Sequence, residues 1–98
     1  MRLLRVKPEG FKYFHNTETY YLNATTLQPS LEKEILIPEG TVLQFFFHQE
    51  ILDGLNLAET NELLIEVESI VREVFSAGRI IWRFTAIRID ENDNRQSD

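Results

Sequence analysis

The two histidines, His15 and His48, are the residues of this chain best suited to acid–base or metal chemistry. Each is expected to end a strand that follows a Pro-Glu-Gly sequence, which would bring both near one sheet edge. Glu50 and Asp53 follow closely, and two imidazoles with a carboxylate suit a transition metal. Histidine is also common at strand ends, and nothing in the spacing enforces a site. A small-molecule- or metal-binding enzyme with a pocket near the histidines is therefore an alternative, and we assign no catalytic residue, metal ligand or cofactor.

Oxygen-bearing side chains near the C-terminus have the spacing that opens a calcium-binding loop. Asp90, Asn92 and Asn94 supply the first three positions. Arg95 stands where such a loop requires glycine, and the sequence stops at Asp98, before a closing glutamate. We interpret this segment as a solvated acidic tail. The absence of cysteine excludes disulfides and thiolate ligands.

The net charge of −6 is unevenly distributed. Residues 1–48 hold five basic and five acidic side chains, so the whole excess lies in residues 49–98. The aromatic strands could stack nucleic-acid bases, with cations from Arg2, Arg5, Lys7 and Lys12. The neutral local charge gives no cationic surface, however, and direct nucleic-acid binding is not expected. An acidic inhibitor or mimic acting on a nucleic-acid-binding protein is a second alternative.

One helix is expected to position the rest of the chain. Asn56 and Glu59 form a capping box, and Gly78 suits the left-handed residue after a helix. Between them the apolar spacing fits a period of 3.6 residues, which predicts a helix over residues 57–77. The apolar residues are Leu63, Leu64, Val67, Ile70, Val71, Val74 and Phe75.

The remaining elements are expected to be strands. A strand begins at Arg79, and its alternation changes phase near residues 86–87, which either a bulge or burial of both faces there would explain. Turn-forming Pro-Glu-Gly sequences at 8–10 and 38–40 separate shorter strands. We predict an α+β fold: a curved antiparallel sheet of five to six strands, with a small open barrel as one form of it, packed against one long helix that precedes the last strand. Residues 1–90 form the domain and 91–98 a disordered acidic tail.

Several strands carry apolar residues on both faces, more than one helix can cover. We therefore predict a non-catalytic protein-interaction or assembly module that uses an apolar sheet face and an acidic helix face. The partner is expected to be a second copy of the chain or a basic protein. The N-terminus does not read as a signal peptide and no membrane segment is evident, so a cytoplasmic protein is expected. The expected partner-binding residues are Phe46, Ile81, Glu62, Glu66 and Ile65.

Overall fold

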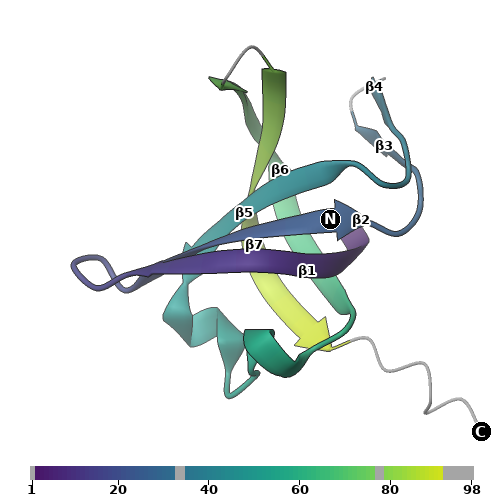
Figure 1. The fold of residues 1–98 in the computed structure, drawn as a ribbon. Coiled ribbons are helices and arrows are strands. Elements are labelled where there is room, and N and C mark those ends of the chain that lie inside the picture. Colours follow the sequence, from purple (N-terminus) through teal and green to yellow (C-terminus); the bar gives the residue numbers. More distant parts are fainter. Residues whose placement is uncertain (1, 33–34, 77–78, 92–98) are drawn as a thin grey trace, which may run out of the picture.

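Five strands close into a barrel (Figure 1). The computed structural model describes residues 2–32, 35–76 and 79–91. Around the barrel the order is β1, β2, β5, β7, β6, and β6 returns to β1. β5 and β7 run parallel and the other neighbouring pairs run antiparallel. The strands are β1 (Arg2–Phe14), β2 (Thr19–Thr26), β5 (Val42–His48), β6 (Leu63–Ser76) and β7 (Arg79–Glu91).

Short elements fill the two long connections of the barrel. β3 (Ser30–Glu32) and β4 (Ile35–Ile37) form a small hairpin between β2 and β5. Two 3₁₀ helices, η1 (Gln49–Leu52) and η2 (Leu57–Glu59), lead from β5 to β6. In Figure 1 the β3–β4 hairpin and the η1–η2 segment lie on opposite sides of the barrel. No helix within the described residues is long and apolar enough to cross a membrane.

The core lies inside the barrel because alternate residues of each strand point inward. Leu43, Phe45 and Phe47 of β5 are buried, and the Phe45 ring stacks on that of Phe84 with centroids 5.7 Å apart. Burying an apolar side chain of this size stabilises the fold by roughly 1.5–3 kcal/mol. The other members of the core are Leu4, Val6, Leu22, Ala24, Ile37, Leu57, Leu63, Ile65, Val67, Ala86 and Ile89.

The predicted long helix is wrong, and with it the α+β fold class. Residues 63–76 form strand β6, which pairs with β7 along its length and with β1 at its start. Leu63, Ile65 and Val67 are buried at alternate positions, which is a period of two. The segment is rich in β-branched residues, which favour strands. The segment also contains apolar residues at further positions, and most of its apolar residues together have the spacing of one face of a helix.

The two Pro-Glu-Gly sequences have different structures. The one at 38–40 is a turn as predicted, and Gly40 has a φ of +87°. The one at 8–10 is not a turn, because β1 runs through it. Pro8 pairs with Ala24 and Gly10 with Asn23, so Glu9 is the extra residue of a bulge. The shorter strands predicted on either side of this sequence are therefore one strand, β1.

Two local predictions are confirmed. Ala86 pairs with Val67 and Arg88 with Glu66, so the extra residue of the predicted bulge in β7 is Ile87. Asn56 is an N-cap whose side chain accepts a 3.0 Å hydrogen bond from Ala58 N–H, although it caps the single turn of η2. Gly78 and residues 92–98, the predicted helix end and most of the predicted tail, lie outside the described residues.

Candidate functional site

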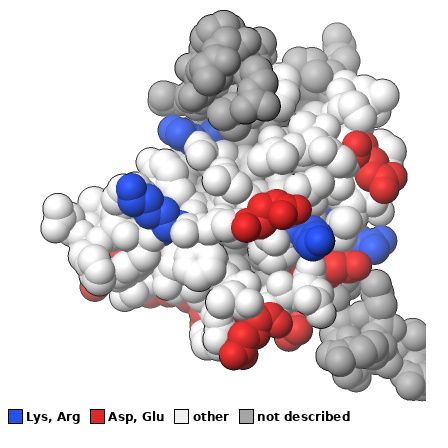
Figure 2. Space-filling model, in the orientation of Figure 1, with Lys and Arg blue, Asp and Glu red and all other residues white. Residues whose placement is uncertain are grey.

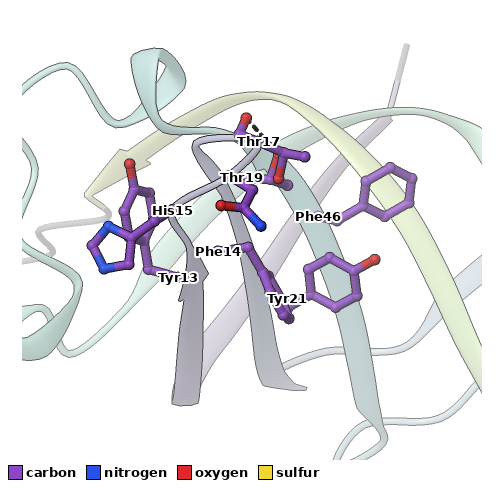
Figure 3. Close-up of a pocket in the computed structure, with 8 residues that line it drawn as sticks. Tyr13, Phe14, His15, Thr17, Thr19, Tyr21 and Phe46 are labelled. Atoms are coloured by element: carbon purple, nitrogen blue, oxygen red, sulfur yellow. Dashed lines mark hydrogen bonds between the residues drawn. The ribbon is translucent and has the colours of Figure 1, made fainter.

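An open aromatic row crosses the outer face of the barrel. Tyr21 and Phe46 face each other in register on β2 and β5, with ring centroids 6.0 Å apart. Phe14, near the end of β1, lies edge-on to Tyr21 at 5.0 Å. Their neighbours Leu22, Phe45 and Phe47 point into the core, so strand alternation turns this row outward. We call Phe14, Tyr21 and Phe46 the outer aromatic row (Figure 3).

A broad hollow of about 680 Å³ lies between the outer aromatic row and the β1–β2 turn. Aromatic rings supply flat apolar walls, and the turn adds hydroxyl, amide and imidazole groups. The hollow is lined by Tyr13, Phe14, His15, Asn16, Thr17, Thr19, Tyr21 and Phe46. This composition suits a flat, partly polar ligand group more than a purely apolar one.

Two cationic side chains lie against the rings. The Arg83 guanidinium carbon is 5.3 Å from the Tyr21 ring centroid, and the Lys12 ammonium is 5.2 Å from that of Phe14. Arg83 Nε also donates a 2.7 Å hydrogen bond to Gln44 Oε1, and Gln44 donates at 3.4 Å to Asn23. The hydrogen bond fixes the guanidinium plane, while its remaining N–H groups can serve an anionic oxygen.

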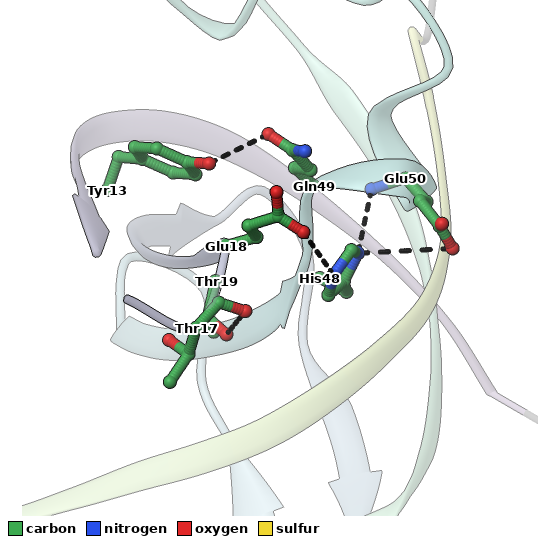
Figure 4. A network of polar contacts seen from close by, with 7 residues as sticks. All are labelled: Tyr13, Thr17, Glu18, Thr19, His48, Gln49 and Glu50. Carbon is green, nitrogen blue, oxygen red and sulfur yellow. Dashed lines mark hydrogen bonds and ion pairs between the residues drawn. The ribbon is translucent and has the colours of Figure 1, made fainter. Parts of the chain in front are cut away.

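A polar network holds the β1–β2 turn against the start of η1 (Figure 4). Gln49 N–H donates a 2.9 Å hydrogen bond to the Glu18 carbonyl, and Tyr13 O–H donates at 2.9 Å to Gln49 Oε1. His48 lies 3.4 Å from the Glu18 carboxylate and 3.9 Å from that of Glu50. Desolvation raises the pKa of Tyr13 above its usual value, and the charge of Glu18 adds to the effect. These contacts position the turn that forms one wall of the hollow.

The two histidines have separate surroundings. His15 lines the hollow, lies edge-on to Tyr13 at 4.8 Å, and extends away from Tyr21 and Phe46 in Figure 3. His48 is not among the lining residues, and its contacts are with Glu18 and Glu50. Among the described residues, no group of three or more possible ligands could hold a metal ion.

The structure does not bring the five predicted partner-binding residues together. Phe46 lies in the outer aromatic row. Ile65 is fully buried in the core, because strand alternation replaces the expected helix face. Glu62 lies 3.4 Å from Arg5, and Glu66 lies 3.9 Å from Arg88. Ile81 belongs to β7, and its side chain lies outside the described part of the structure.

Sequence reasoning did not combine Phe14, Tyr21, Lys12 and Arg83 into one site. It considered Lys12 beside the aromatic strands as a base-stacking surface, but discounted that surface because the first half of the chain is neutral. Three of the four residues come from β1 and β2, and Arg83 is brought beside them because β7 pairs with β5. Tyr20 and Tyr21 are adjacent residues of one strand, so one of the two rings must face outward. This pair was the feature of the sequence that could have indicated an aromatic outer face. The register that aligns Tyr21 with Lys12 and Phe46 could not be predicted from this pair of tyrosines.

The fold and site define a class: a small five-stranded Greek-key barrel with an aromatic, partly cationic outer sheet face. Comparisons of the chain with protein-family models, with curated proteins and with solved structures find no match.

Proposed function

We propose that this protein is a non-catalytic binding module that holds single-stranded nucleic acid across the outer face of β1, β2 and β5. The outer aromatic row is the observation that carries the proposal. Its three rings come from neighbouring strands, so they follow one another across the sheet. Bases stack on exposed rings for about 1–3 kcal/mol each, largely independently of their sequence.

The cations beside the rings supply the second requirement, because each base of a strand is accompanied by a phosphate. Lys12 and Arg83 lie next to Phe14 and Tyr21, where a phosphate would pass when bases stack on those rings. Asn23 and Gln44 add amide groups that suit base edges or sugar hydroxyls.

The overall charge of −6 opposes this function, and the local charge supports it. Around the row, the paired positions on β1, β2, β5 and β7 hold two cations and no acid; they are Lys12, Tyr21, Phe46, Thr85, Asn23, Gln44 and Arg83. Of the acids nearby, Glu18 and Glu50 contact His48, and Glu9 accepts a 2.9 Å hydrogen bond from Thr25 further along β2. We therefore expect binding that depends mainly on stacking, with a shallow salt dependence from about two phosphate contacts.

The strand order adds fold-level support. Counted along the chain, the five barrel strands are arranged 1-2-3-5-4, with the third and fifth parallel. OB-fold barrels have this Greek-key design, and many bind oligonucleotides on the face of strands 2 and 3, beside the loop between strands 1 and 2. Here that face carries the outer aromatic row. Because one fold serves many functions, the analogy is secondary to the site itself.

The test is a titration of the full chain into a fluorescein-labelled oligothymidylate of about twelve nucleotides, followed by anisotropy at several salt concentrations. We expect saturable binding that Phe46→Ala weakens by about 5- to 150-fold, the equivalent of one stacking contact. Leu31→Ala is the matched control, because Leu31 is also exposed but belongs to the distant β3–β4 hairpin. Oligouridylate, mixed-sequence and oligosaccharide probes identify the preferred ligand.

The proposal fails if none of the nucleic-acid probes binds at low salt, or if Phe46→Ala and Leu31→Ala bind alike. Binding of the oligosaccharide alone would assign the same face to a different ligand class.

Protein interaction or assembly is the second candidate function. It is favoured by Leu31 and Leu36, which pair across the β3–β4 hairpin with exposed fractions of 66% and 65%. Light scattering over a dilution series tests self-association, and Leu31→Ser should abolish any dimer formed there. The nucleic-acid mimic is less favoured, because Glu62 and Glu66 contact cations instead of forming an acidic helix face.

A further inference from the structure

A second surface lies along the edge of β1, away from the outer aromatic row. Val6 is the point at which β1 changes partners: it pairs with both Leu63 of β6 and Thr26 of β2. From Lys7 to Phe14 the strand pairs only with β2, and its other edge pairs with no strand among the described residues. Such an edge presents N–H and C=O groups to which another strand can bind.

Two small hollows follow this edge. They measure about 230 and 140 Å³, and both are lined by Phe11 of β1 and Leu57 of η2. Phe11 is 46% exposed although its partner in register on β2, Leu22, is a core residue, which leaves part of its ring free for a ligand. The lining of the larger hollow is mainly apolar and includes Tyr20, Leu52 and Leu55, whereas that of the smaller hollow is mainly polar and includes Glu9 and Thr60. We call this surface the β1 groove.

The wall of the β1 groove opposite β1 is acidic. Residues 49–60 contain Glu50, Asp53 and Glu59 and no lysine or arginine. Asp53 and Glu59 are exposed, flank residues that line the hollows, and form no ion pair with any described residue. In Figure 2 acidic side chains gather at the lower side of the molecule, where Figure 1 places η2.

We infer that the β1 groove binds an extended peptide of a partner protein in which apolar and basic residues alternate along one face of the strand. The peptide backbone adds a strand to the free edge of β1, the mode known as β-augmentation. One apolar side chain enters between Phe11 and Leu57, and a lysine or arginine two residues along the peptide, which points to the same face, lies opposite Asp53 or Glu59. The acidic wall favours a basic partner. Residues 92–98 of this chain do not suit the β1 groove, because they include no apolar residue.

The inference is independent of the nucleic-acid proposal. Phe11 and Lys12 are successive residues of one strand, so their side chains point to opposite faces. Lys12 lies with Phe14 of the outer aromatic row, whereas Phe11 packs at 5.8 Å against Tyr20. A variant at Phe11 should therefore leave oligonucleotide binding intact.

The probe is an acetylated eight-residue peptide with valine and lysine in turn at its odd positions and threonine at its even positions, titrated by calorimetry into the full chain. Two matched peptides replace every lysine by glutamate or every valine by serine, and neither should bind measurably. Phe11→Ser should weaken binding about tenfold or more, as expected for a central apolar contact. Asp53→Asn with Glu59→Gln should remove the salt dependence without touching the core. Leu31→Ser should change neither property.

Amide hydrogen exchange locates the bound peptide. Protection of amides within residues 9–14 on binding is the expected signature of an added strand. The inference is overturned if the valine–lysine peptide does not bind, if the serine–lysine peptide binds equally well, or if the variants bind like wild type. It is also overturned if the free protein is a dimer that Phe11→Ser dissociates, because the occupant would then be a second copy. Melting curves confirm that each variant is folded.

Discussion

Arg83 of β7 and Tyr21 of β2 meet across β5, with the guanidinium carbon 5.3 Å from the ring centroid, although 61 positions of sequence separate them. Gln44 of β5 lies in register with Arg83 and accepts its hydrogen bond. The parallel pairing of β5 with β7 therefore completes the outer face by bringing a cation to aromatic residues from the first half of the chain.

The charge of Arg83 should determine part of the salt dependence of oligonucleotide binding. Arg83→Gln removes one phosphate contact, so the slope of log K against log salt should become about one unit shallower. Arg88→Gln is the control, because Arg88 contacts Glu66 and Asp90 instead of the outer aromatic row. Anisotropy titrations at four or more salt concentrations measure both slopes. Equal slopes for the two variants would exclude Arg83 from the binding face.

Tyr21 and Phe46 should act together in binding. Their rings lie 6.0 Å apart, so one base or two successive bases contact both. In a double-mutant cycle, Tyr21→Ala and Phe46→Ala should show a coupling free energy of about 0.5 kcal/mol or more for oligonucleotide binding. Additive losses would mean that the two rings contact separate parts of the ligand.

The strand assignment of residues 63–76 predicts that Ile65 does not tolerate a charge. Ile65→Glu places a carboxylate in a fully buried position and should lower the free energy of unfolding by about 4 kcal/mol or more. Ile87→Glu is the matched control: Ile87 is the exposed bulge residue of β7, and its effect should stay within about 0.5 kcal/mol. Urea denaturation followed by circular dichroism measures both. A stable Ile65→Glu protein would contradict the burial of Ile65 inside the barrel.

Phe84 should contribute more to stability than any ring of the outer aromatic row. It is fully buried against Phe45, so Phe84→Ala should lower the free energy of unfolding by about 3–5 kcal/mol. Phe14→Ala, at a position that is 37% exposed, should cost about 1 kcal/mol or less while weakening ligand binding. Urea denaturation measures the loss of stability, and anisotropy measures the loss of ligand binding. A larger loss of stability in Phe14→Ala than in Phe84→Ala would contradict the assignment of Phe84 to the core.

Tyr13 should make the protein sensitive to alkaline pH. Its pKa is raised in the folded state, so the folded protein holds the phenolic proton more tightly than the unfolded chain. The resulting stabilisation is fully present below the unfolded pKa of about 10 and is lost as the pH rises through the folded value. Tyr13→Phe should therefore show a smaller loss of Tm between pH 9 and about pH 11 than wild type. Identical losses would mean that other groups cause the alkaline sensitivity.

Local chemistry made some elements predictable from the sequence. Asn56 caps a turn because its side chain reaches a nearby backbone N–H, and Gly40 allows the positive φ of its turn. The bulge at Ile87 appeared as a break in alternation. In each case the determining contacts lie within a few residues, and sequence patterns describe such contacts well.

The elements that were predicted wrongly depend on pairing with strands that are distant in the sequence. Residues 63–67 form a strand because β1 and β7 pair with them on both sides, and neither partner is visible in the local pattern. Glu9 becomes a bulge because β2 continues alongside β1 past Pro8. For the site, Phe46 was identified from its strand, but the alignment of Phe14, Tyr21 and Arg83 beside it requires the register of four strands.

The pairing of β5 with β7 also constrains how the protein is made. During synthesis, residues 44–46 leave the ribosome well before residues 83–85, and β1 likewise waits for residues 63–67. A nascent chain that ends before β6 has an open, three-stranded sheet whose apolar inner face is uncovered. The barrel therefore closes only after β7 has been synthesised, and folding dominated by such distant pairings takes roughly milliseconds to seconds. During that interval the emerging chain is most exposed to aggregation and most dependent on chaperones.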